Sequence, residues 1–139
     1  MSGHGILLVR SEGRRLGLPL EQVLEVGNIS RIDPVPGSVP AVRGVSLARG
    51  RLVPLVHLGA LLSGKECPPL LPDRTQVLAA IARQWLALEV DEADAAPSDE
   101  ILPPPEGSGL AAWVNGVVRL DKSWIPVLNH DALADRLRA

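Results

Sequence analysis

The chain contains one segment twice, and this duplication limits its fold more than any other feature. Val42–Leu61 aligns on Val114–Leu133 without a gap, glycine on glycine and proline on proline. A weaker match places Leu7–Val23 over Val77–Ala93, also without a gap. The two offsets differ by only two residues, so a single short insertion explains both. Self-similarity at a fixed period indicates repeated structural units, and we expect two copies of one small fold.

Each copy has the pattern of short strands. Two apolar runs separated by a polar turn predict a hairpin at the start of each copy. A proline-rich connection follows, and a second hairpin closes the copy with Pro54 or Pro126 in its last strand. Because proline has no amide hydrogen, we expect these two positions at a sheet edge or a bulge. Helical patterns are found in short stretches at 59–62 and 131–138, and the pattern at 21–26 fits a helix or a strand about equally well.

Each half therefore resembles a small SH3-like or related barrel of about five strands. A unit of fewer than about 70 residues rarely has a core large enough to be stable alone. We expect an all-β fold in which two pseudo-symmetric five-stranded SH3-like β-barrels share one apolar core, with few short helices.

The composition excludes several classes of function. Phe and Tyr are absent and the formal net charge is −2, whereas binding of nucleic acid calls for a basic surface, often with aromatic rings. Cys67 is the single cysteine, so we expect a free thiol and no multi-cysteine metal site. The start of the chain lacks a signal-peptide pattern, and no apolar run reaches the length of a membrane span. We expect a soluble, cytoplasmic protein with no direct membrane insertion.

The sequence contains no motif typical of an enzyme or of a metal or cofactor site. His4, His57 and His130 lack the spacing of a metal site, and the last two are interpreted as residues at strand ends. The carboxylates between Glu89 and Glu100 are interpreted as a solvated acidic loop. The serines lack a nucleophile-elbow pattern, and no glycine-rich phosphate cradle opens a helix. We therefore predict neither catalytic, cofactor-binding nor metal-binding residues.

A surface for binding proteins is the remaining interpretation. Neighbouring side chains on a strand point to opposite faces, so the apolar residues of short barrels cannot all point inward. Val23, Val26, Val42 and Val45 are candidates for an exposed apolar strip, and a contiguous strip of this kind marks a docking surface. The alternative that any one of these residues belongs to the core stays open.

The segments LGLPLEQVLEV, DPVPGSVPAVRGV and RGRLVPLVHL, in this order and spacing, resemble the CheW-like adaptor domain of bacterial chemosensory systems. The second half continues the match, so the resemblance covers nearly the whole chain. It implies a single domain over 1–139, with one barrel mainly from 16–75 and the other mainly from 76–128. The N-terminus and the C-terminal segment would be exchanged between the barrels.

The resemblance implies an adaptor that is not an enzyme. Such proteins bind the cytoplasmic tip of methyl-accepting chemoreceptors in a groove between the barrels, and bind the regulatory domain of the histidine kinase CheA. Other CheW-like proteins are further partners, and the expected location is in cytoplasmic chemosensory clusters. The receptor-binding residues carried over from the family are Val23, Glu25, Val26, Val42, Gly44 and Val45. Glu25 is also expected to form a structural ion pair with Arg49.

This chain departs from the family pattern before Arg49. The family has Ile-Asn-Leu where this chain has Ser46-Leu47-Ala48. This departure motivates the hypothesis that the kinase contact is weakened while the receptor contact is kept. Two alternatives stay open: a CheW-like docking module outside a receptor–kinase array, and a small-ligand binder or enzyme that uses His57, Glu25 and Arg49.

Overall fold

The computed structural model describes residues 5–29, 31–35, 39–81, 83–97, 100–107 and 113–138. His4 lies outside these residues. Ten strands and two α-helices occur in the described part of the chain. The elements of the first half are β1 (Gly5–Ser11), β2 (Arg14–Pro19), a 3₁₀ turn (Leu20–Gln22), β3 (Val23–Asn28), β4 (Val42–Ala48), β5 (Arg51–His57) and α1 (Leu58–Ser63). Those of the second half are β6 (Thr75–Ile81), β7 (Gln84–Val90), β8 (Glu92–Pro97), β9 (Val114–Leu120), β10 (Ser123–Leu128) and α2 (His130–Arg138).

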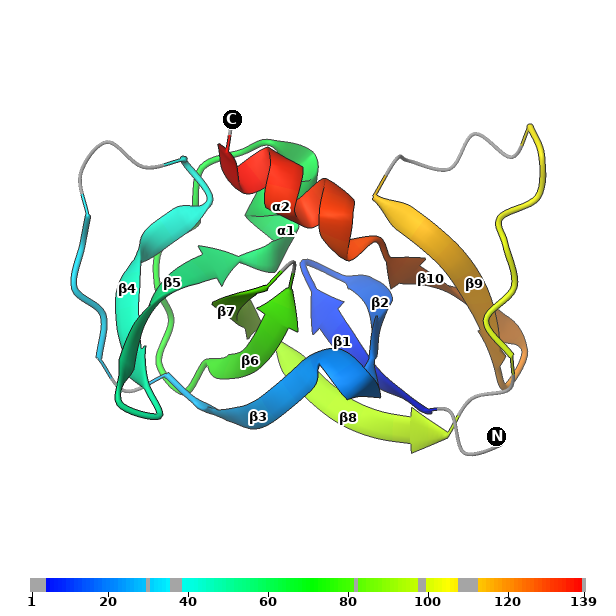
Figure 1. The fold of residues 1–139 in the computed structure, drawn as a ribbon, viewed down its shortest axis with the longest axis horizontal. Coiled ribbons are helices and arrows are strands. Elements are labelled where there is room, and N and C mark those ends of the chain that lie inside the picture. Colours follow the sequence, from blue (N-terminus) through cyan, green and yellow to red (C-terminus); the bar gives the residue numbers. More distant parts are fainter. Residues whose placement is uncertain are drawn as a thin grey trace.

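The strands form two five-stranded sheets that exchange their first hairpins. Sheet A has the order β8-β1-β2-β10-β9, and sheet B has the order β3-β6-β7-β5-β4. Figure 1 shows sheet B on the left and sheet A on the right, with α1 and α2 together between them. Each sheet thus takes one hairpin from the other half of the chain. The expected boundary between the two barrels lies after residue 75. The structure differs, because β6 and β7 belong to sheet B together with β3, β4 and β5.

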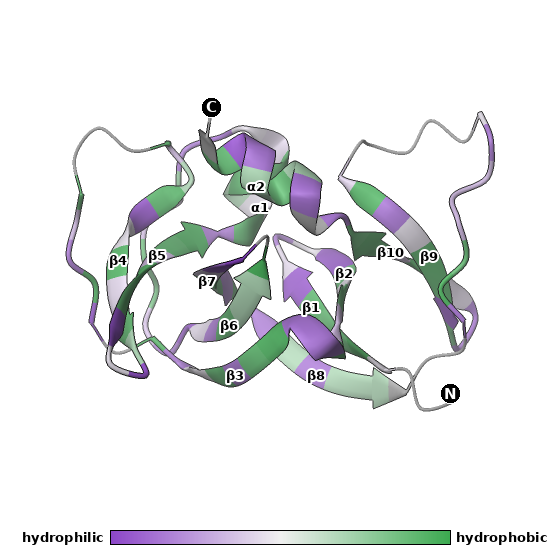
Figure 2. Cartoon of the chain, viewed as in Figure 1, coloured by the Kyte–Doolittle hydropathy of each residue, from purple (hydrophilic) through white to green (hydrophobic). Residues whose placement is uncertain are grey.

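The exchange follows from burial on both faces of the hairpins. In β7 every residue from Leu86 to Val90 is buried, which is the pattern of a strand covered on both sides. One face of each exchanged hairpin packs in a large core shared by the two sheets. The other face of each hairpin packs in a smaller cluster of its own sheet. Leu78 and Ala87 belong to the cluster of sheet B, and Ile6 belongs to that of sheet A. Figure 2 shows the hydrophobic residues along β5, β6 and β10 in the middle of the molecule.

The two copies have equivalent elements in the same order. Both sheets contain one parallel ladder, between β5 and β7 and between β10 and β2. Pro54 lies on β5, and the pairing of β5 with β7 begins one residue later, at Leu55. The amide hydrogen that Pro54 lacks is therefore not needed for a bond to β7. The all-β fold of two pseudo-symmetric five-stranded units on a shared apolar core is therefore confirmed. The β-ladders leave each described sheet open between its two outer strands.

Candidate partner-binding surface

The six residues expected to bind a receptor lie on the two outer strands of sheet B. Val23, Glu25 and Val26 are on β3, and Val42, Gly44 and Val45 are on β4. These strands stand at opposite ends of the strand order. Glu25 and Val26 are exposed, whereas the other three non-glycine side chains are half-buried, and Val23 and Val42 also pack against the shared core. The structure therefore does not place the six residues on one continuous strand pair.

Arg49 links the two outer strands. This residue lies in the turn between β4 and β5, and its Nε donates to Glu25 Oε2 at 3.2 Å. Its Nη2 donates to the backbone oxygen of Leu24 at 2.8 Å. The Glu25–Arg49 pair is thus present, and both side chains are about half exposed. Solvent weakens an ion pair of this kind to about 0–1 kcal/mol, so its main effect is to hold the hairpin tip against β3.

Gly44 allows the connection after β3 to cross the edge of β4. The backbone of Asp33 exchanges two hydrogen bonds with that of Val45, at 2.9 and 3.0 Å. A Cβ atom on Gly44 would lie 2.2 Å from the Asp33 backbone oxygen, and its φ of +152° is rare for other residues. Gly44 is buried beneath this crossing. Its substitution, by arginine for example, would therefore disturb the fold as well as any contact with a partner.

A groove runs beside the start of β4. It has a volume of about 650 Å³ and is lined by Ile32, Pro34, Pro40, Val42, Arg43, Glu66, Cys67 and Leu70. Most of these side chains are apolar, and Arg43 and Glu66 supply charge. Cys67 is a free, half-buried thiol whose Sγ lies 3.2 Å from the backbone oxygen of Ala41. Val42 is the one predicted receptor-binding residue in this lining.

A buried ion network next to this groove was missed from the sequence. Glu89 is 1% exposed on β7, and both of its carboxylate oxygens are bonded to arginines. Arg43 makes two hydrogen bonds to it, and Arg74 Nε donates at 2.9 Å. Arg74 also pairs with Asp91 at 2.5 Å, and Asp91 accepts the backbone N–H of Glu12 at 3.1 Å. The interpretation of the acidic segment as a solvated loop is thus wrong for Glu89.

The arginines determine the charge of Glu89. Burial raises the pKa of this carboxyl, but the hydrogen bonds from Arg43 and Arg74 outweigh burial and lower its pKa below the ordinary 4.5. The carboxylate is therefore charged at neutral pH. The nearly continuous apolar run in QWLALEV gave one available signal, because it places Glu89 on a strand that must be covered on both faces.

His57 has a structural role at the end of β5. Its Nδ1 accepts the backbone N–H of Ala60 at 3.0 Å and caps α1, and Asn129 accepts the corresponding bonds at the start of α2. Burial lowers the pKa of His57 below 6.5, despite the opposing effect of Glu89. Arg49 precedes β5 and His57 ends it, so a strand of seven residues, about 23 Å long, separates them. A single ligand or catalytic site built from His57, Glu25 and Arg49 is therefore contradicted.

The tip of the β4–β5 hairpin carries an exposed apolar pair. Leu47 and Leu52 face each other across the strands and are 63% and 69% exposed. Next to them the guanidinium of Arg51 stacks 4.0 Å from the ring centre of Trp85. The β9–β10 hairpin has the same geometry with Arg119 opposite Trp124.

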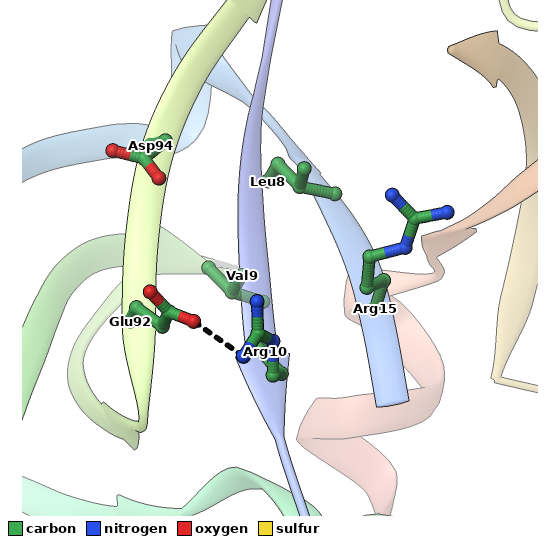
Figure 3. Close-up of a pocket in the computed structure, with 6 residues that line it drawn as sticks. All are labelled: Leu8, Val9, Arg10, Arg15, Glu92 and Asp94. Carbon is green, nitrogen blue, oxygen red and sulfur yellow. Dashed lines mark ion pairs between the residues drawn. The ribbon is translucent and has the colours of Figure 1, made fainter. Parts of the chain in front are cut away.

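Sheet A lacks the charges that link the outer strands of sheet B. Asp94 is the equivalent of Glu25, because it lies opposite Leu8 on β1 just as Glu25 lies opposite Leu78 on β6. In the aligned repeats, Asp121 is the equivalent of Arg49. Figure 3 shows Asp94 on β8, with the ion pair of Arg10 and Glu92 (2.6 Å) further along the same strands. The Glu25–Arg49 link is thus replaced by two acids in the second half.

Among the described residues no group of three or more His, Cys, Asp or Glu side chains is placed to hold a metal ion. No helix in the same part of the chain has the length and apolarity needed to cross a bilayer.

Comparison with known proteins identifies relatives along nearly the whole chain. The family model described as the CheW-like domain matches residues 5–138. Protein FrzA of Myxococcus xanthus is 31% identical over 131 residues, covering 89% of this chain and 81% of FrzA. Protein PilI of Pseudomonas aeruginosa is 34% identical over 131 residues, covering 90% of this chain and 72% of PilI. The crystal structure of the scaffolding protein TtCheW from Thermoanaerobacter tengcongensis superposes with a TM-score of 0.79 at 25% identity, covering 93% of this chain and 90% of that one.

Proposed function

Because the chain belongs to the CheW-like domain family, we propose that it binds the cytoplasmic tip of a methyl-accepting chemoreceptor and couples it to a CheA-type histidine kinase, or modulates that coupling. The family consists of non-enzymatic scaffold and coupling proteins of chemotaxis and signal transduction, which confirms the prediction that the chain is not an enzyme. Its proposed location is in cytoplasmic chemosensory clusters.

The observation that carries this proposal is the linked pair of outer strands in sheet B. Val26 and the outward face of β4 offer apolar contact area, and the Glu25–Arg49 pair fixes these strands relative to each other. The groove beside Val42 extends this area with further apolar side chains. A rigid apolar surface with charged residues at its rim is suited to a preformed partner such as a helical hairpin.

The second half supplies a matched control for the receptor contact. Val45 and Val117 are equivalent half-buried strand residues, and each exchanges backbone hydrogen bonds with a crossing connection. Val45→Asp is expected to weaken binding of a soluble receptor-tip fragment at least about tenfold, whereas Val117→Asp leaves it within about twofold. Isothermal titration calorimetry measures both affinities, and circular dichroism checks the fold. Equal effects of the two substitutions would show that the receptor surface is misplaced.

The kinase contact is the second part of the proposal. Of the three residues that depart from the family pattern, Ser46 and Ala48 are buried and Leu47 is exposed. We therefore attribute the proposed weakening of the kinase contact to Leu47. In the same calorimetry, Leu47→Asn, which restores the family residue, is expected to strengthen binding of the CheA regulatory domain and to leave receptor binding unchanged. Unchanged kinase affinity would refute this part alone.

A docking module outside a receptor–kinase array is the alternative. It would keep the fold and an apolar surface, but it would bind neither the receptor tip nor the kinase domain in these titrations.

A further inference from the structure

The groove beside β4 is formed by three segments that meet only in the folded chain. The start of β4 supplies Val42 and Arg43, the connection between β3 and β4 supplies Ile32 and two prolines, and the segment between α1 and β6 supplies Glu66, Cys67 and Leu70. The last segment joins the two copies of the repeat, so it has no equivalent within the second copy. This wall of the groove is therefore particular to sheet B.

The bottom of the groove is held in place by buried contacts. The side chain of Arg43 is only 10% exposed and makes two hydrogen bonds to the buried carboxylate of Glu89. The Cys67 thiol donates to the backbone oxygen of Ala41, 3.2 Å away, and this contact ties the segment after α1 to the chain just before β4. The groove is thus preformed, and a partner that fills it loses little free energy in ordering its walls.

The rim of the groove is open and apolar. Leu70 is 48% exposed at the rim, and the next residue along the chain, Leu71, is 61% exposed. A protein partner commonly covers an exposed apolar area of this kind. Val42 belongs both to the groove and to the proposed receptor surface, so the groove continues that surface within sheet B. The apolar stripe of an amphipathic helix is the occupant that fits such an open groove.

Glu66 gives the groove a negative charge. Arg43 is the other charged residue of the lining, and Glu89 neutralises it. Glu66 itself is exposed, and in the described part of the chain its carboxylate has no ion-pair or hydrogen-bond partner. A lysine or arginine of a docked helix would pair with Glu66, whereas an acidic side chain at the same place would face a like charge.

We infer that this groove receives the apolar stripe of the receptor-tip helix, and that Glu66 selects receptors with a lysine or arginine beside that stripe. The inference rests on the proposed function and adds to it the residue that discriminates between receptors.

The test changes the charge and the apolar rim of the groove separately. Glu66→Lys reverses the charge, and Glu106→Lys makes the same change of net charge at an exposed position on the connection before β9. Leu70→Ser removes apolar area from the rim, and Leu102→Ser is its control, since Leu102 is 39% exposed on the connection before β9. All four side chains are exposed, so circular dichroism should show an unchanged fold in each variant.

Isothermal titration calorimetry with the soluble receptor-tip fragment measures the affinities. Binding is expected to be at least about tenfold weaker for Glu66→Lys and about fivefold weaker for Leu70→Ser, and within about twofold of the unmodified chain for both controls. Fragments in which each exposed lysine or arginine near the tip is replaced by glutamate, one at a time, identify the partner of Glu66. One of these fragments should bind Glu66→Lys more tightly than it binds the unmodified chain.

The outcomes separate the inference from the proposed function. If the unmodified chain does not bind the receptor-tip fragment, the proposed function fails and the inference fails with it. If the chain binds but Glu66→Lys has no more effect than Glu106→Lys, or no charge-reversed fragment prefers Glu66→Lys, only the inference is overturned. Equal affinities of Leu70→Ser and Leu102→Ser would show that the helix does not enter the groove, which also overturns the inference alone.

Discussion

Gly44→Ala is expected to be among the most destabilising small substitutions in the chain. The new Cβ would lie 2.2 Å from the backbone oxygen of Asp33, so the connection that crosses β4 must move by about 1 Å to restore van der Waals contact. This shift breaks or lengthens the two backbone hydrogen bonds between Asp33 and Val45, each with a net value of about 0.5–1.5 kcal/mol. Alanine at a φ of +152° adds about 1–3 kcal/mol of strain.

Together these effects lower the free energy of unfolding by about 2–6 kcal/mol, a large share of the total stability of about 5–15 kcal/mol of a typical domain. Urea titration followed by circular dichroism measures the loss. Gly27→Ala is the control, since an added Cβ there meets no atom within 4 Å, and its effect should stay within about 1 kcal/mol. Gly116→Ala, 2.6 Å from the Leu102 oxygen, should lie between the two. Equal midpoints for Gly44→Ala and Gly27→Ala would refute the steric reasoning.

Two further predictions concern buried polar groups. The lowered pKa of His57 means that the unfolded chain binds its proton first, so stability is full above about pH 6.5 and decreases as the pH falls below it. A second decrease begins below about pH 4.5, because the lowered pKa of Glu89 means that the same carboxyl in the unfolded chain takes up a proton while Glu89 in the folded chain is still charged. Thermal melts from pH 8 to 3 should show both decreases. His57→Asn, which can cap α1 without titrating, should remove the first one, and an unchanged profile in this variant would contradict the assignment to His57. Ser46 Oγ and Gln76 Oε1 lie 3.5 Å apart inside sheet B, where sheet A has Val118 and Ile6. Ser46→Val should cost about 1–3 kcal/mol in urea titrations because it leaves the Gln76 amide unpaired, and the addition of Gln76→Ile should recover most of the loss; additive costs would show that the two side chains are independent.

The duplication could be predicted from the sequence, whereas the exchange of hairpins could not. The two copies share the same local pattern, so a hairpin such as β6–β7 fits the sheet of either half equally well. The unbroken burial of Leu86–Val90 indicated only that this strand has a core on both faces. Which sheet contains the hairpin is decided by long-range packing, and this cannot be derived from the order of residues along one repeat.

The individual site residues differ in how far the sequence defined them. The Glu25–Arg49 pair was expected from the resemblance, because family motifs preserve the residues of such a link. Glu89 was misinterpreted because its partners, Arg43 and Arg74, come from segments that meet only in the folded sheet. The role of Gly44 was likewise hidden, since it depends on the crossing of Asp33 over β4.

The differences between the two copies explain why only one half of the chain is proposed to bind the receptor. Both halves keep the crossing connection, with Gly44 beneath Asp33 and Gly116 beneath Leu102. Only sheet B has opposite charges at the two positions that join its outer strands, because sheet A has acids at both. Two carboxylates repel each other and cannot replace the guanidinium bonds to Glu25 and to the backbone of Leu24. The shared fold therefore provides two scaffolds, and the side chains make the proposed receptor surface on one of them.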